Sequence, residues 1–334
     1  MDTAEMSSRL SNTRALLPSL ESALKSFASS SSRFRVIRTV KPSSSSSVPT
    51  SSSPADSSHP KTLFILDSSF NPPSIAHKAL ALAALRNTQE PRPHRLVLLF
   101  STHNADKSPS PASFEHRLAL MTVFAEDLAH GLSQSASSSS QPTSRQQQQE
   151  QQEGEAIPEI DVALTKTPYY VDKSIAIREE ASPVPYPSHP THIHLIGYDT
   201  LVRFLAPKYY PDSDPPLSAL APYFGAGHKV VAALRPGSTS VNQVDGDSEE
   251  EQREYVEGLK RGSLEKEGFK REWAERVRLV EVGEEAAGVS STRIRKAAQK
   301  GEWKVLEENC TPGVAGWVRE MALYGEDARG SKMA

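Results

Sequence analysis

The chain has 334 residues, of which 38 are Lys or Arg and 41 are Asp or Glu, so its formal net charge at pH 7 is −3. This balance, with basic residues scattered along the chain, argues against a nucleic-acid-binding surface. The single cysteine, Cys310, excludes an internal disulfide framework and a cysteine-based zinc site. No apolar run approaches the roughly 20 residues that a membrane span needs. We expect a protein of the cytoplasm or nucleus that contacts neither membrane nor nucleic acid.

The predicted elements alternate between strands and helices. Near the N-terminus we expect an amphipathic helix at 14–27 and an added edge strand at 34–40. Buried strands are expected at 63–66, 95–100, 160–164, 192–196, 229–234 and 278–282. Helices are expected at 75–86, 113–128, 170–180, 200–205, 290–300 and 311–324. This alternation predicts an α/β fold with a doubly wound parallel sheet.

Three stretches are too polar to contribute to a core and look like low-complexity segments. They are a Ser/Pro-rich linker at 43–60 and two insertions near 133–156 and 238–262. We predict one domain with these insertions, preceded by an N-terminal segment and followed by a short tail. The corresponding ranges are 61–326, 1–42 and 327–334.

The stretch 63–77 (LFILDSSFNPPSIAH) carries the first candidate site. After its strand, two adjacent prolines impose a turn because they fix φ and lack a backbone donor. Ser74 can cap the helix that follows, which puts His77 in the first helical turn. A helix N-terminus at the carboxyl end of a parallel strand favours an anion such as phosphate. The alternative is an ordinary strand–turn–helix corner with an exposed histidine.

A second candidate site follows the last predicted strand, at 289–295 (VSSTRIR). Three hydroxyl residues begin a helix there, and hydroxyls and free N–H groups can both hold phosphate oxygens. The planar guanidinium of Arg295 can reach the same anion. The alternative is an ordinary serine cap followed by solvated arginines.

Both stretches resemble motifs of one enzyme family. The first is similar to the opening signature of the nucleotidyltransferase superfamily, [GS]-x-F-x-P-x-[HT]-x-x-H, matched by Ser68, Phe70, Pro72, Ser74 and His77. The second resembles the ISSTxIR motif of nicotinamide mononucleotide adenylyltransferases, and the resemblance continues at Gly301, Leu306, Pro312, Val314 and Trp317. It covers most of 62–324. The N-terminal segment and the Ser and Gln tracts look like the fungal branch of the eukaryotic family.

The resemblance implies roles for individual residues. His77 and Arg295 would be catalytic, and with Lys107 they would supply charge to the phosphates. Binding of ATP or NAD is implied for Ser68, Ser69, Phe70, Ser74, His77, Lys107, Gly197, Asp199, Arg235, Ser291, Thr292 and Arg295. A tyrosine would stack on the base, with Tyr169, Tyr170 and Tyr209 as candidates. The chain departs from the family at Ser68, which replaces a glycine and adds a Cβ beside the ligand path.

The implied reaction is adenylyl transfer from ATP to nicotinamide mononucleotide, which gives NAD and pyrophosphate. Mg²⁺ would accompany ATP and keep most of its waters, so no protein metal ligands are expected. One alternative is transfer to another phosphorylated acceptor, such as pantetheine or choline phosphate. Another is a nucleotide-binding adaptor with little catalysis. His192 and His194 lie on one face of a strand and could ligate a metal, but no third ligand is evident.

Deletion of residues 133–154 should leave the melting temperature and the activity nearly unchanged. The stretch has few apolar side chains to bury, and a long surface loop adds little to the entropy of chain closure. Circular dichroism melts and an activity assay of the full chain and the deletion variant measure this. A large loss of folded protein would show that the stretch is structural.

Overall fold

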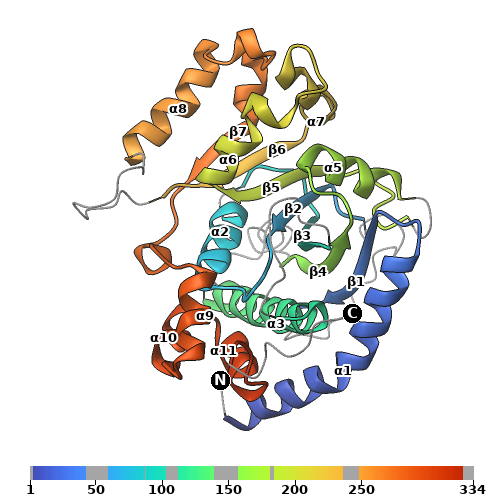
Figure 1. Cartoon of the computed structure of the whole chain (residues 1–334), viewed down its shortest axis with the longest axis vertical. Coiled ribbons are helices and arrows are strands. Elements are labelled where there is room, and N and C mark those ends of the chain that lie inside the picture. The colour runs from blue at the N-terminus through green and yellow to red at the C-terminus, as the bar shows by residue number, and fades with distance from the viewer. Residues whose placement is uncertain are drawn as a thin grey trace, which may run out of the picture.

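The computed structural model describes residues 3–42, 59–86, 88–102, 112–138, 157–180, 184–235 and 248–325. These residues form a central sheet with helices on both faces (Figure 1). The strands are β1 (Phe34–Val40), β2 (Thr62–Asp67), β3 (His94–Ser101), β4 (Glu159–Thr165), β5 (Thr191–Gly197), β6 (Lys229–Ala233) and β7 (Val277–Val280).

The sheet has the order β1-β4-β3-β2-β5-β6-β7. Strands β2 to β7 pair in parallel, whereas β1 pairs antiparallel with β4 and forms the added edge strand that the sequence predicted. The chain winds outward in one direction from β2 through β3 to β4 and in the other from β5 through β6 to β7. This confirms the predicted doubly wound α/β fold. It also places the switch point, where such folds bind ligands, between the carboxyl ends of β2 and β5.

Helices cover both faces of the sheet because each buried strand is apolar on both sides. Along β2, Phe64 and Leu66 face one core cluster, while Leu63 and Ile65 face another. The first face is covered by α1 (Thr3–Ser29), α2 (Ile75–Leu85), α3 (Phe114–Ser138), α9 (Ser291–Gln299), α10 (Trp303–Asn309) and α11 (Pro312–Glu320). The second is covered by α5 (Tyr170–Glu179), α6 (Tyr198–Phe204), α7 (Ala221–Gly225) and α8 (Glu249–Arg261).

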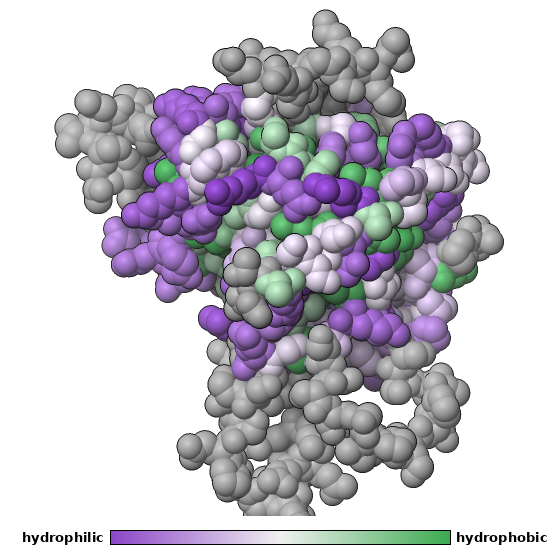
Figure 2. Space-filling view, turned by 90° about the horizontal axis from the view of Figure 1, so that it is seen from below, coloured by the Kyte–Doolittle hydropathy of each residue, from purple (hydrophilic) through white to green (hydrophobic). Residues whose placement is uncertain are grey.

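Short 3-10 turns join these elements, at η1 (Pro207–Tyr209), η2 (Pro216–Leu220), η3 (Glu265–Glu267), η4 (Arg271–Arg276) and η5 (Glu284–Ala286). The face seen from below in Figure 2 is covered mostly by hydrophilic residues, with hydrophobic ones in small groups between them. Within the described ranges, no helix is both long enough and apolar enough to cross a bilayer.

The structure corrects the prediction that 238–262 has nothing to bury. Residues 249–261 form α8, which begins with a Ser248 cap and buries Val256 and Leu259. The sequence did not indicate this helix because Val256 and Leu259 lie among charged residues. The acidic run 249–251 lies in the first turn of α8, where negative charge stabilises the helix dipole. Residues 133–138 of the other predicted insertion continue α3, and 139–156 lie outside the described residues.

Helix α8 also holds the backbone of a predicted site residue. The side chain of Gln252 is buried, and its Oε1 accepts a hydrogen bond from the backbone N–H of Arg235 at 2.9 Å. Its Nε2 donates to the backbone carbonyl of Arg235 at 2.7 Å. Two reciprocal bonds thus fix the chain where it leaves β6, on the side of the sheet that carries the switch point.

Gln252→Ala should lower the free energy of unfolding by about 1–3 kcal/mol, because it leaves a backbone donor and a backbone acceptor without partners. Urea unfolding of the variant and of wild type measures this change. Glu254→Gln on the exposed side of α8 serves as the control and should leave the midpoint within error. Equal midpoints for Gln252→Ala and wild type would contradict a positioning role for Gln252.

Candidate active site

The turn between β2 and α2 places His77 at the switch point. Ser74 caps α2 with extended backbone angles, and Phe70 has φ 44, an unusual value for a bulky residue. The Phe70 ring is fully buried and contacts Phe124 at a centroid distance of 6.4 Å. Phe70 was predicted as a binding residue, and in this structure the whole residue is buried in the core.

His77 is held in one tautomer by this turn. Its Nδ1 accepts a hydrogen bond from the backbone N–H of Ser74 at 3.0 Å and lies 2.8 Å from the Ser74 hydroxyl. The proton is therefore on Nε2, which lies 2.9 Å from the Ser68 hydroxyl. Burial lowers the pKa of His77 to about 4, so the ring is neutral at pH 7. His77 thus offers a neutral hydrogen-bond donor, where the sequence predicted a charge.

The second motif meets the same turn. Ser291 Oγ donates to the carbonyl of Pro72 at 2.9 Å, and Arg295 Nη1 donates to the carbonyl of Asn71 at 2.7 Å. Arg295 Nη2 also donates to the hydroxyl of Thr292 at 3.1 Å. The N-termini of α2 and α9 therefore converge, although more than 200 residues separate them. Two converging helix N-termini and a guanidinium form a site suited to an anion.

Two other predicted residues, Asp199 and Arg235, lie together beyond β5 and β6. Arg235 Nη1 is 2.9 Å from Asp199 Oδ2, and both side chains are exposed. Gly197, the N-cap of α6, faces open space, because nothing lies within 4 Å of the position a Cβ would take. These residues share the carboxyl edge of the sheet with the turn after β2. Lys107 lies outside the described residues.

A pocket of about 330 Å³, which we call the tyrosine pocket, opens beside Ser68 and Ser69. All three tyrosines that the sequence left as candidates line it, and Tyr210 joins them. The complete lining is Asp67, Ser68, Ser69, Ser101, Pro168, Tyr169, Tyr170, Lys173, Thr200, Arg203, Phe204, Tyr209 and Tyr210. Burial keeps the pKa values of Tyr170 and Tyr210 well above their ordinary range, so both phenols stay protonated. Flat neutral rings of this kind can stack on a planar base.

The sequence did not reveal the buried ion pair between Asp67 and Lys173 in this pocket. Asp67 ends the first predicted strand, and nothing in the sequence linked it to Lys173, about 100 residues further along the chain. The available signal was spacing, since Lys173 follows Tyr170 by three positions and precedes the buried Ile177 by four, on one helix face. Arg203, also missed, is an exposed lining residue.

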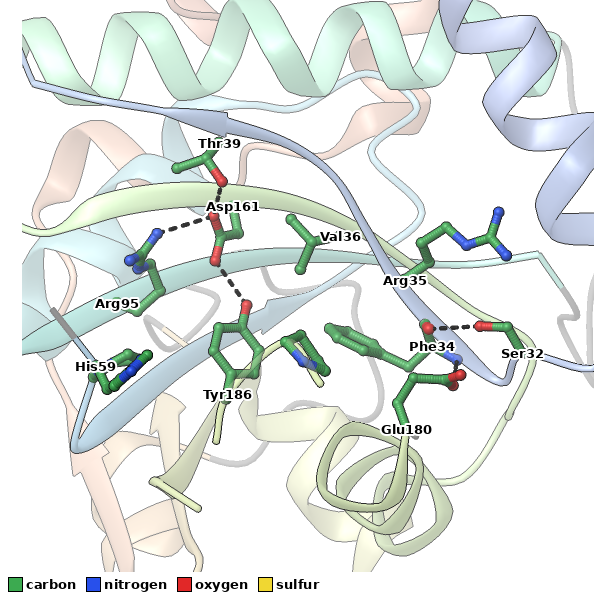
Figure 3. A pocket seen from close by; sticks show the side chains of 12 residues that line it. Ser32, Phe34, Arg35, Val36, Thr39, His59, Arg95, Asp161, Glu180 and Tyr186 are labelled. Carbon is green, nitrogen blue, oxygen red and sulfur yellow. Dashed lines mark hydrogen bonds and ion pairs between the residues drawn. The ribbon is translucent and has the colours of Figure 1, made fainter. Parts of the chain in front are cut away.

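A second pocket, of about 220 Å³, lies at the β1 edge, where β3 and β4 begin (Figure 3). At its centre Asp161 accepts hydrogen bonds from Thr39 at 2.6 Å, Tyr186 at 2.7 Å and Arg95 at 3.2 Å. The polar groups at this centre satisfy one another. None of the residues predicted for the active site lines it.

His192 and His194 pack in the interior. His192 stacks on His228 with ring centroids 4.1 Å apart, and His194 Nδ1 lies 2.9 Å from the Tyr223 hydroxyl. Burial lowers the pKa of both histidines well below the ordinary value. Among the described residues, no group of three or more His, Cys, Asp or Glu side chains could hold a metal ion.

A known protein resembles this chain over most of its length. No protein-family model matches the chain. It is 29% identical over 243 residues to a Schizosaccharomyces pombe protein named "Putative nicotinamide mononucleotide adenylyltransferase". The match covers 72% of this chain and 78% of the relative. This relative confirms the resemblance to nicotinamide mononucleotide adenylyltransferases.

Two solved structures also align with the chain. One is a Plasmodium falciparum nicotinic acid mononucleotide adenylyltransferase complexed with NaAD, at 13% identity and a TM-score of 0.41, covering 79% of this chain and 97% of that one. The other is described as a putative nicotinate-nucleotide adenylyltransferase from Vibrio parahaemolyticus, at 15% identity and a TM-score of 0.30, covering 80% and 96%. These distant likenesses do not define a substrate for this chain.

Nitrogen-15 NMR of the imidazole should show His77 as the neutral Nε2–H tautomer at pH 7, because its pKa is about 4. The unfolded chain has a histidine pKa near 6.5 and binds this proton first as the pH falls. His77 therefore makes folding less favourable as the pH falls from about 6.5 to about 4. A His77→Gln variant assigns the signal. An imidazolium pattern at pH 6 would contradict this assignment.

Proposed function

We propose that the chain transfers the adenylyl group of ATP to the phosphate of nicotinamide mononucleotide, giving NAD and pyrophosphate. The observation that carries the proposal is the convergence of the N-termini of α2 and α9 on one turn, directly beside the tyrosine pocket. The two helix N-termini favour phosphates, whereas the tyrosine pocket favours a flat ring. The substrates of this reaction carry both kinds of group.

In this reaction an oxygen of the mononucleotide phosphate attacks the α-phosphorus of ATP. A new P–O bond forms, the bond from the α-phosphorus to the bridging oxygen breaks, and pyrophosphate leaves with the electron pair. Little covalent help is needed, so the chain acts by alignment and by stabilising charge. His77 Nε2–H would donate to a phosphate oxygen that takes the place of the Ser68 hydroxyl. Arg295 has N–H donors beyond the two that hold Asn71 and Thr292.

The tyrosine pocket would take the pyridine ring of the acceptor. Its aromatic lining favours an acceptor with a flat base over pantetheine or choline phosphate, which have no ring to stack. The S. pombe relative named for nicotinamide mononucleotide supports the same acceptor. Ser68 and Ser69 line the pocket beside the turn that holds His77, so the mononucleotide phosphate would point toward the ATP phosphates.

Mg²⁺ would enter bound to the triphosphate and neutralise charge as pyrophosphate leaves. The carboxylates at this edge of the sheet fit an ion held mainly by phosphate and water. Asp67 is paired with Lys173 and Asp199 with Arg235, so each carboxylate already faces a cation of the protein. Phosphate-binding residues here act by hydrogen bonding and by fixed charge.

The proposal is tested by incubating purified chain and MgATP with nicotinamide mononucleotide, nicotinic acid mononucleotide, pantetheine phosphate or choline phosphate. Pyrophosphate release and product mass are followed. NAD formation with nicotinamide mononucleotide is expected. Tight ATP binding without pyrophosphate from any acceptor would overturn the enzyme proposal in favour of a nucleotide-binding adaptor.

His77→Ala should lower kcat about 100-fold or more, the size of effect seen when one preorganised donor to a transition-state charge is lost. Steady-state NAD formation measures kcat, and a thermal melt confirms folding. His130→Ala on the surface of α3 is the matched control and should behave like wild type. A wild-type kcat for His77→Ala would mean that His77 does not contact the reacting phosphates.

Arg295→Ala should raise the KM for ATP and also lower kcat, because its guanidinium would contact phosphate both before and during transfer. Arg293→Ala, two positions away on the same helix, is the control. Arg295→Lys should restore only part of the loss, since an ammonium lacks the planar fork. Unchanged KM and kcat in Arg295→Ala would place the triphosphate elsewhere.

A further inference from the structure

The wall of the tyrosine pocket contains a buried pair of opposite charges. Asp67 Oδ2 accepts a hydrogen bond from Lys173 Nζ, and the two side chains are only 7% and 6% exposed. Asp67 ends β2 at the switch point, and Lys173 lies in the first turn of α5. The Lys173 ammonium also lies 4.9 Å from the centroid of the Tyr170 ring. Both charges line the pocket.

Stability is a weak reason for such a pair, because the cost of taking two charges out of water often exceeds their attraction. The pair also has unused hydrogen-bonding capacity. An ammonium has three donors, and Asp67 takes one. Asp67 Oδ1 has no hydrogen-bond partner among the described residues, and it is not among the fully enclosed polar atoms. Asp67 Oδ1 and the remaining donors of Lys173 thus have no hydrogen-bond partner among the described residues, and both residues line the pocket.

A donor beside an acceptor matches a carboxamide. A carboxamide oxygen can accept from Lys173 while its NH₂ donates to Asp67. A carboxylate at the same place has acceptors only, so it gains from Lys173 but meets Asp67 as a like charge. Because the two protein charges cancel, the pair offers the acid no net attraction and offers the amide two hydrogen bonds.

We propose that the Asp67–Lys173 pair selects nicotinamide mononucleotide over nicotinic acid mononucleotide. This inference rests on the proposed function, since it assigns the pyridine ring to the tyrosine pocket. Asp67 excludes the acid, and Lys173 both holds Asp67 in place and donates to the amide oxygen. The acceptor's amide or acid group, the one difference between the two mononucleotides, is thereby recognised by two residues.

The test is calorimetric binding of each mononucleotide to wild type, Asp67→Asn and the double variant Asp67→Asn/Lys173→Met. Wild type should bind the amide at least about tenfold more tightly than the acid. Asp67→Asn leaves the charge of Lys173 unopposed. The ratio of amide affinity to acid affinity should therefore fall by about tenfold or more. The double variant has neither charge and should lie between the other two.

Glu90→Gln is the control, because Glu90 pairs with Lys229 at 2.6 Å at the opposite edge of the sheet. It should leave the ratio unchanged. The inference is overturned if wild type prefers the acid, or if the ratio of amide affinity to acid affinity is the same in all variants. The proposed function stands in either case if the chain still forms NAD. Binding of neither mononucleotide overturns both. If Asp67→Asn fails to fold in a thermal melt, the double variant decides, and a wild-type ratio there overturns the inference.

Discussion

Hydrogen bonds from α9 to the turn after β2 hold the candidate site together. The carbonyls of Asn71 and Pro72 accept from Arg295 and Ser291, which anchors the start of α9 beside the start of α2. The buried Asn71 side chain also accepts from the Tyr324 hydroxyl at 2.8 Å, so the C-terminal segment meets the same turn. The order of the strands switches between β2 and β5, beside this turn, and folds of this kind bind ligands at such a point.

The electrostatics of the site depend on fixed donors more than on mobile charge. His77 is neutral at pH 7 and its tautomer is set by Ser74, so it presents an N–H without the desolvation cost of a buried cation. Arg295 supplies permanent charge, and the hydrogen bond from its side chain to the backbone carbonyl of Asn71 limits its movement. Such donors need little reorganisation when charge develops on a phosphate. The tyrosine pocket next to them is lined by aromatic rings, and Asp67 and Lys173 in its wall pair with each other.

The fold and the two helix starts at the candidate site could be predicted because local signals carry them. Apolar runs mark the strands, and both helix starts carry hydroxyl caps with a basic or imidazole group within two turns. Helix α8 was missed because only three of its positions, Gln252, Val256 and Leu259, are buried among charged neighbours. The Asp67–Lys173 pair and Tyr210 were missed because their meeting depends on long-range packing of β2, α5 and the segment after α6. Periodicity within α5 places Lys173 on the buried face of the helix, but it does not say which residue of another element Lys173 meets.

The most direct measurement is a crystal structure of the chain with a non-hydrolysable ATP analogue and nicotinamide mononucleotide. The account predicts the triphosphate between the starts of α2 and α9, within hydrogen-bond distance of His77 Nε2 and Arg295, and the pyridine ring among the tyrosines. A basic groove on the outer side of α9, lined by Arg293, Lys296 and Lys300, is the alternative anion site that the described residues offer. Triphosphate in that groove, with the turn after β2 unoccupied, would contradict the account.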